Sequence, residues 1–144
     1  KAELKLKEIR TERKSTVKEA ANLLAMMVYN NIRKLSIIPG ISHFIVGGRD
    51  EYGFHVYDLS PDGSIAEIDD YNTSGSGSVM VYGVLETLYK KNMSIEEGTK
   101  LVIKSLSAAI QRDIASGNGI DIITITKDGV KKVFSKEIDT KIEA

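Results

Sequence analysis

Hydroxyl side chains alternate with glycines over residues 73–78, and this stretch carries the side chains best suited to chemistry. The run Thr73-Ser74-Gly75-Ser76-Gly77-Ser78 leads directly into Val79, Tyr82 and Leu85, whose spacing predicts a helix. Glycines let a backbone approach another segment closely, and serines supply caps and hydroxyls where a helix start has unpaired N–H groups. Such a segment can hold an anion, a carboxylate or a strained backbone.

Three interpretations of this stretch stay open on local grounds. The plainest is a well-capped helix start that packs tightly on a sheet. A phosphate loop is weaker, because it needs Lys followed by Ser or Thr after its last glycine, and the chain has Ser78-Val79 there. The dinucleotide fingerprint needs a different glycine spacing. A supporting role in a catalytic centre is the third interpretation, and it needs residues from elsewhere in the chain.

Asp113 is the second candidate, near the end of a helix that begins after Ser94 and stops at Gly117-Asn118-Gly119. A carboxylate in the last turn faces the negative end of the helix dipole, which is unfavourable unless a cation compensates. Ser116 lies three residues on, so we expect both side chains on one helix face. The compensating group is either local, such as Arg112 or a lysine, or an ammonium or hydroxyl from another part of the molecule.

The remaining pattern predicts an α+β chain. Helix pairs alternate with groups of antiparallel strands, which is not the order of a parallel-sheet protein. Capping boxes at Thr16 and Ser94 start two helices, and Asp128-Gly129 predicts a hairpin. The predicted helices cover residues 1–13, 17 to before Pro39, 79–91, 95–116 and, on weaker grounds, 135–142. The predicted strands cover residues 41–48, 54–59, 64–68, 120–126 and 130–134.

Composition excludes several functional classes. With 144 residues, 42% of them hydrophobic, we expect one domain over residues 1–144. Lys plus Arg equals Asp plus Glu, at 20 each, which argues against nucleic acid or an anionic membrane as a partner. The chain has no cysteine, which excludes disulfides and cysteine-based zinc sites and fits a cytoplasmic location. No apolar run approaches the roughly 20 residues needed to span a bilayer, and no signal-peptide pattern opens the chain.

His43 and His55 lie in predicted strands without the spacing of metal ligands, so we expect ordinary strand residues, no metal site and no cofactor. The chain opens at Lys1 inside a helical pattern that has neither a start residue nor a cap. Five strands also make a small sheet area for four substantial helices to cover. We therefore expect these residues to continue a longer polypeptide, with further strands upstream.

Taken together, the motifs resemble those of β-type proteasome subunits of the archaeal kind. The resemblance covers essentially the whole chain in the right order, and the combination of motifs is specific although each alone is weak. The segments that carry it are Thr73-Ser74-Gly75-Ser76-Gly77-Ser78, Tyr82-Gly83-Val84-Leu85-Glu86, Gln111-Arg112-Asp113, Ser116-Gly117-Asn118-Gly119-Ile120-Asp121, Ile45-Val46-Gly47-Gly48 and Ser94-Ile95-Glu96-Glu97-Gly98.

The resemblance implies a four-layer αββα sandwich of the N-terminal-nucleophile hydrolase class, incomplete at its N-terminus. Its members stack as seven-membered β rings with α-subunit rings and cleave polypeptides with the hydroxyl of an N-terminal threonine, assisted by its amino group and a lysine. Asp113 and Ser116 match the pair that orders this threonine, and Ser76 matches a further hydrogen-bonding neighbour. The cation that Asp113 lacks would then be the threonine ammonium or the lysine.

The nucleophile, the lysine, the oxyanion-hole glycine and most of the specificity pocket would precede Lys1, so we expect these 144 residues to be inactive alone. Two other functions stay open. One is a non-catalytic structural subunit of the same ring, and the other is an unrelated α+β module that binds phosphate at residues 74–78. The residue at the family's nucleophile position would separate the first two, and stabilisation by nucleotide would favour the third.

Overall fold

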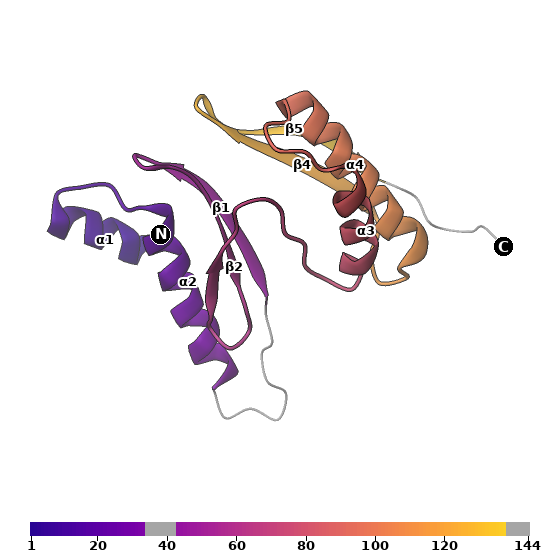
Figure 1. Ribbon diagram of the computed structural model, residues 1–144. Coiled ribbons are helices and arrows are strands. Elements are labelled where there is room, and N and C mark those ends of the chain that lie inside the picture. Colours follow the sequence, from indigo (N-terminus) through magenta and orange to yellow (C-terminus); the bar gives the residue numbers. More distant parts are fainter. Residues whose placement is uncertain (34–42, 138–144) are drawn as a thin grey trace. The chain divides into compact units, whose positions relative to one another are not determined.

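The computed structural model describes residues 1–33 and 43–137, which belong to two compact units, Lys1–Asp69 and Asp70–Ala144. Each unit combines helices with an antiparallel sheet, so the predicted α+β class is confirmed (Figure 1).

The first unit packs one helix on a three-stranded sheet. Helices α1 (Ala2–Thr11) and α2 (Val17–Ile32) precede the strands β1 (Phe44–Asp50), β2 (Gly53–Leu59) and β3 (Ile65–Glu67), which pair in the order β1-β2-β3. In Figure 1, α2 runs along one face of this sheet. The core lies between them and consists of Ala21, Ala25, Tyr57 and Leu59.

Two interactions fix the start of α2. The predicted capping box is present, since the Thr16 hydroxyl accepts from the Glu19 N–H and the Glu19 carboxylate accepts from the Thr16 N–H. Asp50 adds a contact from the end of β1, because its Oδ2 accepts from the Val17 N–H at 2.8 Å. The hairpin between β1 and β2 is tighter than predicted, since Arg49 and Asp50 belong to β1 and Asp50 pairs with Gly53.

The second unit packs two helices side by side with a hairpin against the longer one (Figure 1). Its elements are α3 (Ser78–Leu88), α4 (Ile95–Arg112), β4 (Gly119–Thr126) and β5 (Gly129–Glu137). The capping box at Ser94 is present, and Gly129 closes the predicted hairpin at a φ of 114°. The core between α3 and α4 consists of Val81, Leu85, Leu101 and Ala109.

Two sequence predictions in this unit, on residues 135–137 and on the cap of α3, are wrong. Residues 135–137 are not helical, because β5 continues to Glu137 in register with β4, and the Ser135 hydroxyl donates to Asp121 at 2.6 Å. Cross-strand hydrogen bonds prevail there over a weak helical pattern, and the rest of that predicted helix lies outside the described residues. The serines of the glycine-rich run also do not cap α3, since its N-cap is Gly77, which has no side chain to offer.

Candidate active site

Ser76, Asp113 and Ser116, the three candidates from the sequence, meet at one point in the second unit. Both hydroxyls donate to the same oxygen, Asp113 Oδ2, each at 2.5 Å. Ser76 comes from the glycine-rich loop and is exposed, whereas Asp113 and Ser116 follow α4 and are half-buried. Ser76 therefore reaches a carboxylate 37 positions further along the chain.

Gly77 lets the loop lie against the end of α4. It is buried, and a Cβ at this position would meet the Ser116 Oγ at 2.7 Å and the Ala109 Cβ at 2.9 Å. Both distances are shorter than the contacts that Cβ atoms make in proteins, so any side chain here would push the loop away from the helix. The glycine is needed for close approach, since its φ of −81° is open to any residue.

Asp113 and Ser116 converge through a turn and not along a helix face as predicted. Helix α4 ends at Arg112, and Asp113 is its C-cap with the extended dihedrals φ −107° and ψ 115°. The Ser116 N–H donates to the Asp113 carbonyl at 3.1 Å, which closes the turn. The spacing of three residues thus brought the side chains together, but the backbone that does so is not helical.

Hydroxyl groups, and not a cation, stabilise the charged form of Asp113 here. The Ser116 hydroxyl, and after it the Ser76 hydroxyl, hold the pKa of Asp113 below its usual range, while partial desolvation opposes them. The ion pairs among residues 1–33 and 43–137 do not include Asp113, so Arg112 is not its partner in the described chain. The other carboxylate oxygen, Oδ1, receives a 3.4 Å contact from the Ala115 N–H.

This arrangement suits a cation and does not suit an anion. Asp113 is ionised and lies at the negative end of α4, where a positive group is favoured. Its carboxylate also takes up the Ser76 hydroxyl, which a phosphate cradle would have needed for its own ligand. The structure therefore argues against the phosphate-loop interpretation of residues 74–78.

Sequence reasoning missed a second polar cluster, in the first unit. His55 contacts the Glu67 carboxylate at 3.0 Å through Nδ1 and Asp50 at 3.4 Å through Nε2. The Tyr57 hydroxyl also donates to Glu67. The alternation of His55 and Tyr57 on one strand face could have indicated half of this cluster. No group of His, Cys, Asp and Glu within the described ranges is arranged to hold a metal ion.

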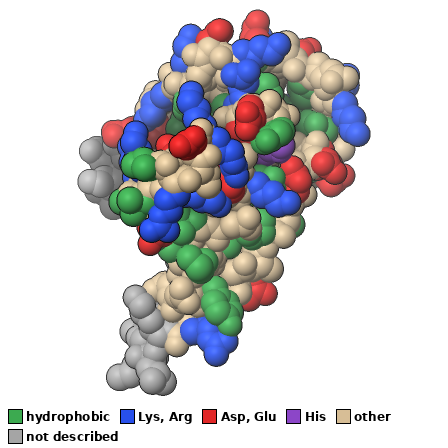
Figure 2. Space-filling model, turned by 90° about the vertical axis from the view of Figure 1, so that its left-hand side faces the viewer, with side chains coloured by type: hydrophobic (Ala, Val, Ile, Leu, Met, Phe, Trp, Pro, Cys, Tyr) green, Lys and Arg blue, Asp and Glu red, His purple; other side chains and the backbone are tan. Residues whose placement is uncertain are grey.

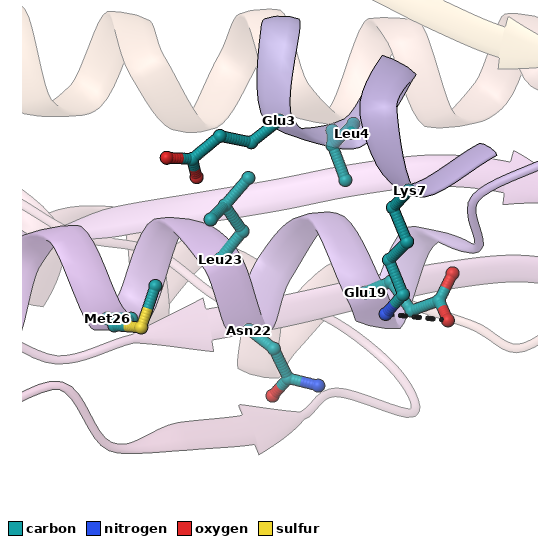
Figure 3. Close-up of a pocket in the computed structure, with 7 residues that line it drawn as sticks. All are labelled: Glu3, Leu4, Lys7, Glu19, Asn22, Leu23 and Met26. Carbon is teal, nitrogen blue, oxygen red and sulfur yellow. Dashed lines mark ion pairs between the residues drawn. The ribbon is translucent and has the colours of Figure 1, made fainter. Parts of the chain in front are cut away.

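A groove between α1 and α2 is one concave feature of the first unit (Figure 3). It has a volume of about 260 Å³, with the Lys7–Glu19 ion pair at one end. On the face in Figure 2, acidic, basic and apolar side chains are interspersed. The groove has no cluster of reactive side chains, and its lining residues are Glu3, Leu4, Lys7, Glu19, Asn22, Leu23 and Met26. In the described part of the chain, no helix is long and apolar enough to cross a membrane.

The chain is similar in sequence to known proteins. The proteasome subunit family matches residues 1–125 of the chain. Proteasome subunit beta of Nanoarchaeum equitans is 42% identical over 134 residues, which are 93% of this chain and 67% of that protein. The subunits beta of Archaeoglobus profundus and Methanocaldococcus jannaschii are 39% and 38% identical and are aligned over 95% and 99% of this chain. The chain spans 62% of the length of each of these two relatives.

Proposed function

This chain belongs to the proteasome subunit family, and from that premise we propose that it is the larger part of a β subunit that acts as a threonine-type endopeptidase. In this proposal the complete subunit degrades unfolded proteins to short peptides. The nucleophilic threonine and its lysine precede Lys1 in the full-length protein, and residues 1–144 alone have no peptidase activity. One domain would include both compact units.

The observation that carries the proposal is the Asp113 carboxylate held by two hydroxyl groups at a helix C-terminus. A carboxylate with a depressed pKa and no cationic partner among the described residues suits the ammonium of an N-terminal residue or of a lysine. Ser76 and Ser116 fix the orientation of the carboxylate, so that Asp113 and Ser116 order the incoming amine and hydroxyl.

These residues have supporting roles in the proposed reaction. The threonine hydroxyl oxygen attacks the peptide carbonyl carbon, and its proton passes to the amino group of the threonine and then to the departing amine. Water hydrolyses the resulting ester and restores the hydroxyl. Asp113 keeps the amine oriented through both steps, and no cofactor or metal is needed.

The proposed partners are other β subunits in a seven-membered ring, α-subunit rings and polypeptide substrates, in the cytoplasm. Support for the assembly comes from the matched relatives, each of which is named as a subunit of the proteasome. The equal numbers of acidic and basic residues, 20 each, give no reason to add nucleic acid to this list.

The test compares two aspartates in the full-length subunit assembled with its partners. Asp113→Asn keeps the shape and removes the charge, and we expect hydrolysis of fluorogenic peptides to fall by about 10²-fold or more. Asp121→Asn is the matched control, since Asp121 also accepts from a serine hydroxyl but lies on β4 with Lys132 as its ion-pair partner. We expect the control to retain nearly full activity.

Each contrary outcome identifies what is wrong. A wild-type assembly without hydrolytic activity would favour the alternative function, a non-catalytic structural ring subunit. An active wild type with an equally active Asp113→Asn variant would refute the role given to Asp113 and leave the family assignment intact. Activity of residues 1–144 alone would refute an upstream nucleophile.

A further inference from the structure

Asn72 and Tyr82 tie together the two ends of the glycine-rich loop. The Asn72 Oδ1 accepts from the Tyr82 hydroxyl at 2.7 Å and from the Thr73 N–H at 2.8 Å. Asn72 precedes the loop and Tyr82 lies in α3 just after it, so these bonds close a ring that contains Ser76. The ring is shorter than a dozen residues, because the two side chains are 10 positions apart.

The hydrogen bonds determine which way the Asn72 amide points. Thr73 offers an N–H and Tyr82 offers an O–H, so the group that faces both must be the carbonyl oxygen. Exchanging Oδ1 and Nδ2 would direct an NH₂ group at the Thr73 N–H and leave both donors unpaired. The Nδ2 is buried and has no acceptor among the described residues, so the contacts that Asn72 makes are those of Oδ1.

Neighbouring aromatic rings hold the Tyr82 end in place. The Tyr71 ring lies 6.3 Å from the Tyr82 ring and 4.8 Å from the Tyr89 ring, in a tilted and an edge-on arrangement. Tyr71 also packs against the core between α3 and α4. The ring contacts restrict the position of the Tyr82 side chain. The loop is therefore held at two places, through Tyr82 at its end and through Ser76 at Asp113.

We propose that Asn72 and Tyr82 form a clamp that positions the Ser76 hydroxyl on the Asp113 carboxylate. The loop is also held by the Ser76–Asp113 hydrogen bond, by a turn in which the Ser78 N–H donates to the Gly75 carbonyl, and by the packing of Gly77, while Ser76 itself is exposed. Both clamp residues are positioning residues, since the hydrogen bonds described for each do not involve Asp113. The inference rests on the proposed function only for its effect on catalysis.

The test measures the pKa of Asp113 in the full-length chain, by carbon-13 NMR of labelled aspartate. Ser76→Ala removes one donor directly, so the pKa of Asp113 should rise. Tyr82→Phe removes only the clamping hydroxyl, and we expect it to produce most of the same rise. In the double variant, the pKa of Asp113 should be almost the same as in Ser76→Ala alone, because the effect of Tyr82→Phe passes through Ser76.

Tyr89→Phe is the matched control. It removes a hydroxyl from another tyrosine at the end of the same helix, next to Tyr71, and should leave the pKa of Asp113 unchanged. Additive effects of Tyr82→Phe and Ser76→Ala would overturn the clamp, as would an unchanged pKa of Asp113 in Tyr82→Phe. Circular dichroism of each variant checks that the fold is kept.

The catalytic consequence is measured separately in the assembled subunit. We expect Tyr82→Phe to lower kcat for a peptide substrate severalfold with little change in KM, since in this proposal the Tyr82 hydroxyl acts on the Ser76–Asp113 contact and not on substrate binding. An inactive wild type would remove the proposed function but would leave the titration result standing. A normal kcat in Tyr82→Phe, together with a raised pKa of Asp113, would confirm the clamp and refute its catalytic role.

Discussion

Asp50 and Asp113 are two aspartates at opposite ends of helices, and their partners differ in kind. Asp50 lies at the N-terminus of α2 and accepts from the N–H groups of Val17 and Tyr52, with His55 as a third neighbour. Asp113 lies at the C-terminus of α4, and its strong partners are two neutral hydroxyls. Backbone N–H groups, led by that of Val17, lower the pKa of Asp50, whereas side-chain hydroxyls lower that of Asp113.

The difference separates a structural carboxylate from one suited to chemistry. The helix dipole favours the charge of Asp50 and opposes that of Asp113. Asp50 joins a strand to a helix across 33 residues and has no need of a further partner. Asp113 is preorganised but lacks a cation within the described chain, which is the condition expected of a site that receives one.

The largest expected effects come from two glycines, one in each unit. A Cβ at Gly77 would meet the Ser116 Oγ at 2.7 Å, and a Cβ at Gly48 would meet the Val17 Cγ2 at 2.8 Å. We expect Gly77→Ala and Gly48→Ala each to lower the free energy of unfolding by about 1–3 kcal/mol, because both overfill a close contact. Chemical denaturation of the full-length chain measures this loss.

Only Gly77→Ala should also alter the candidate site. Displacing the loop weakens the Ser76 and Ser116 hydrogen bonds, so the pKa of Asp113 should rise, while Gly48→Ala should leave it unchanged. An equal effect of both variants on Asp113 would mean that general loss of stability, and not loop placement, controls the site.

Asp50→Asn tests the structural half of the comparison. Loss of the charge weakens the contact with the Val17 N–H and with His55, so the thermal midpoint should fall by several degrees. Peptidase activity per folded, assembled subunit should stay the same, in contrast with Asp113→Asn. A large loss of activity in folded Asp50→Asn would erase the distinction between the two aspartates.

Local signals allowed much of the fold to be predicted from the sequence. The capping boxes at Thr16 and Ser94 and the turn at Asp128-Gly129 are present, because each depends on residues within a few positions of one another. The extension of β5 to Glu137 was missed, because it depends on pairing with β4 and not on the local pattern.

The sequence predicted which residues form the candidate site but not how the backbone brings them together. Local spacing indicated that Asp113 needs partners and that Ser116 lies near it, and the resemblance to a known family added Ser76. Neither could show that Ser116 arrives through a turn, or that Asn72 and Tyr82 close the loop. Such contacts depend on backbone positions that only the folded chain defines.

The two capping boxes should contribute equally to the free energy of unfolding, whereas the two aspartates differ in their roles. Thr16→Ala and Ser94→Ala each remove a side chain that accepts from the N–H three residues on, so each should lower the free energy of unfolding by about 1 kcal/mol. Urea denaturation measures both. A much larger loss for Thr16→Ala would show that Glu19, which also bonds Arg13, depends on Thr16 for its position.

The smallest expected effect is on the pH dependence of stability, which should differ in direction between Glu19 and Tyr71. Arg13, with the Thr16 N–H and Lys7, lowers the pKa of Glu19 from 4.5 to about 2. A depressed carboxyl contributes stability above its unfolded value, and this contribution is lost as the pH falls from 4.5 to about 2. The Glu86 carboxylate, which accepts from the Tyr71 hydroxyl, raises the pKa of Tyr71 from 10 to about 12.

A raised phenol contributes stability that is present below pH 10 and is lost as the pH rises to about 12. Glu19→Gln should therefore flatten only the acid side of the stability curve, and Tyr71→Phe only the alkaline side. Urea unfolding of each variant across both pH ranges measures the slopes. If Glu19→Gln left the acid slope unchanged, the ion pairs of Glu19 would add nothing to the free energy of unfolding, as is common for exposed pairs. The hydrogen bond from the Val17 N–H to Asp50 would then remain as the carboxylate interaction that joins α2 to its sheet.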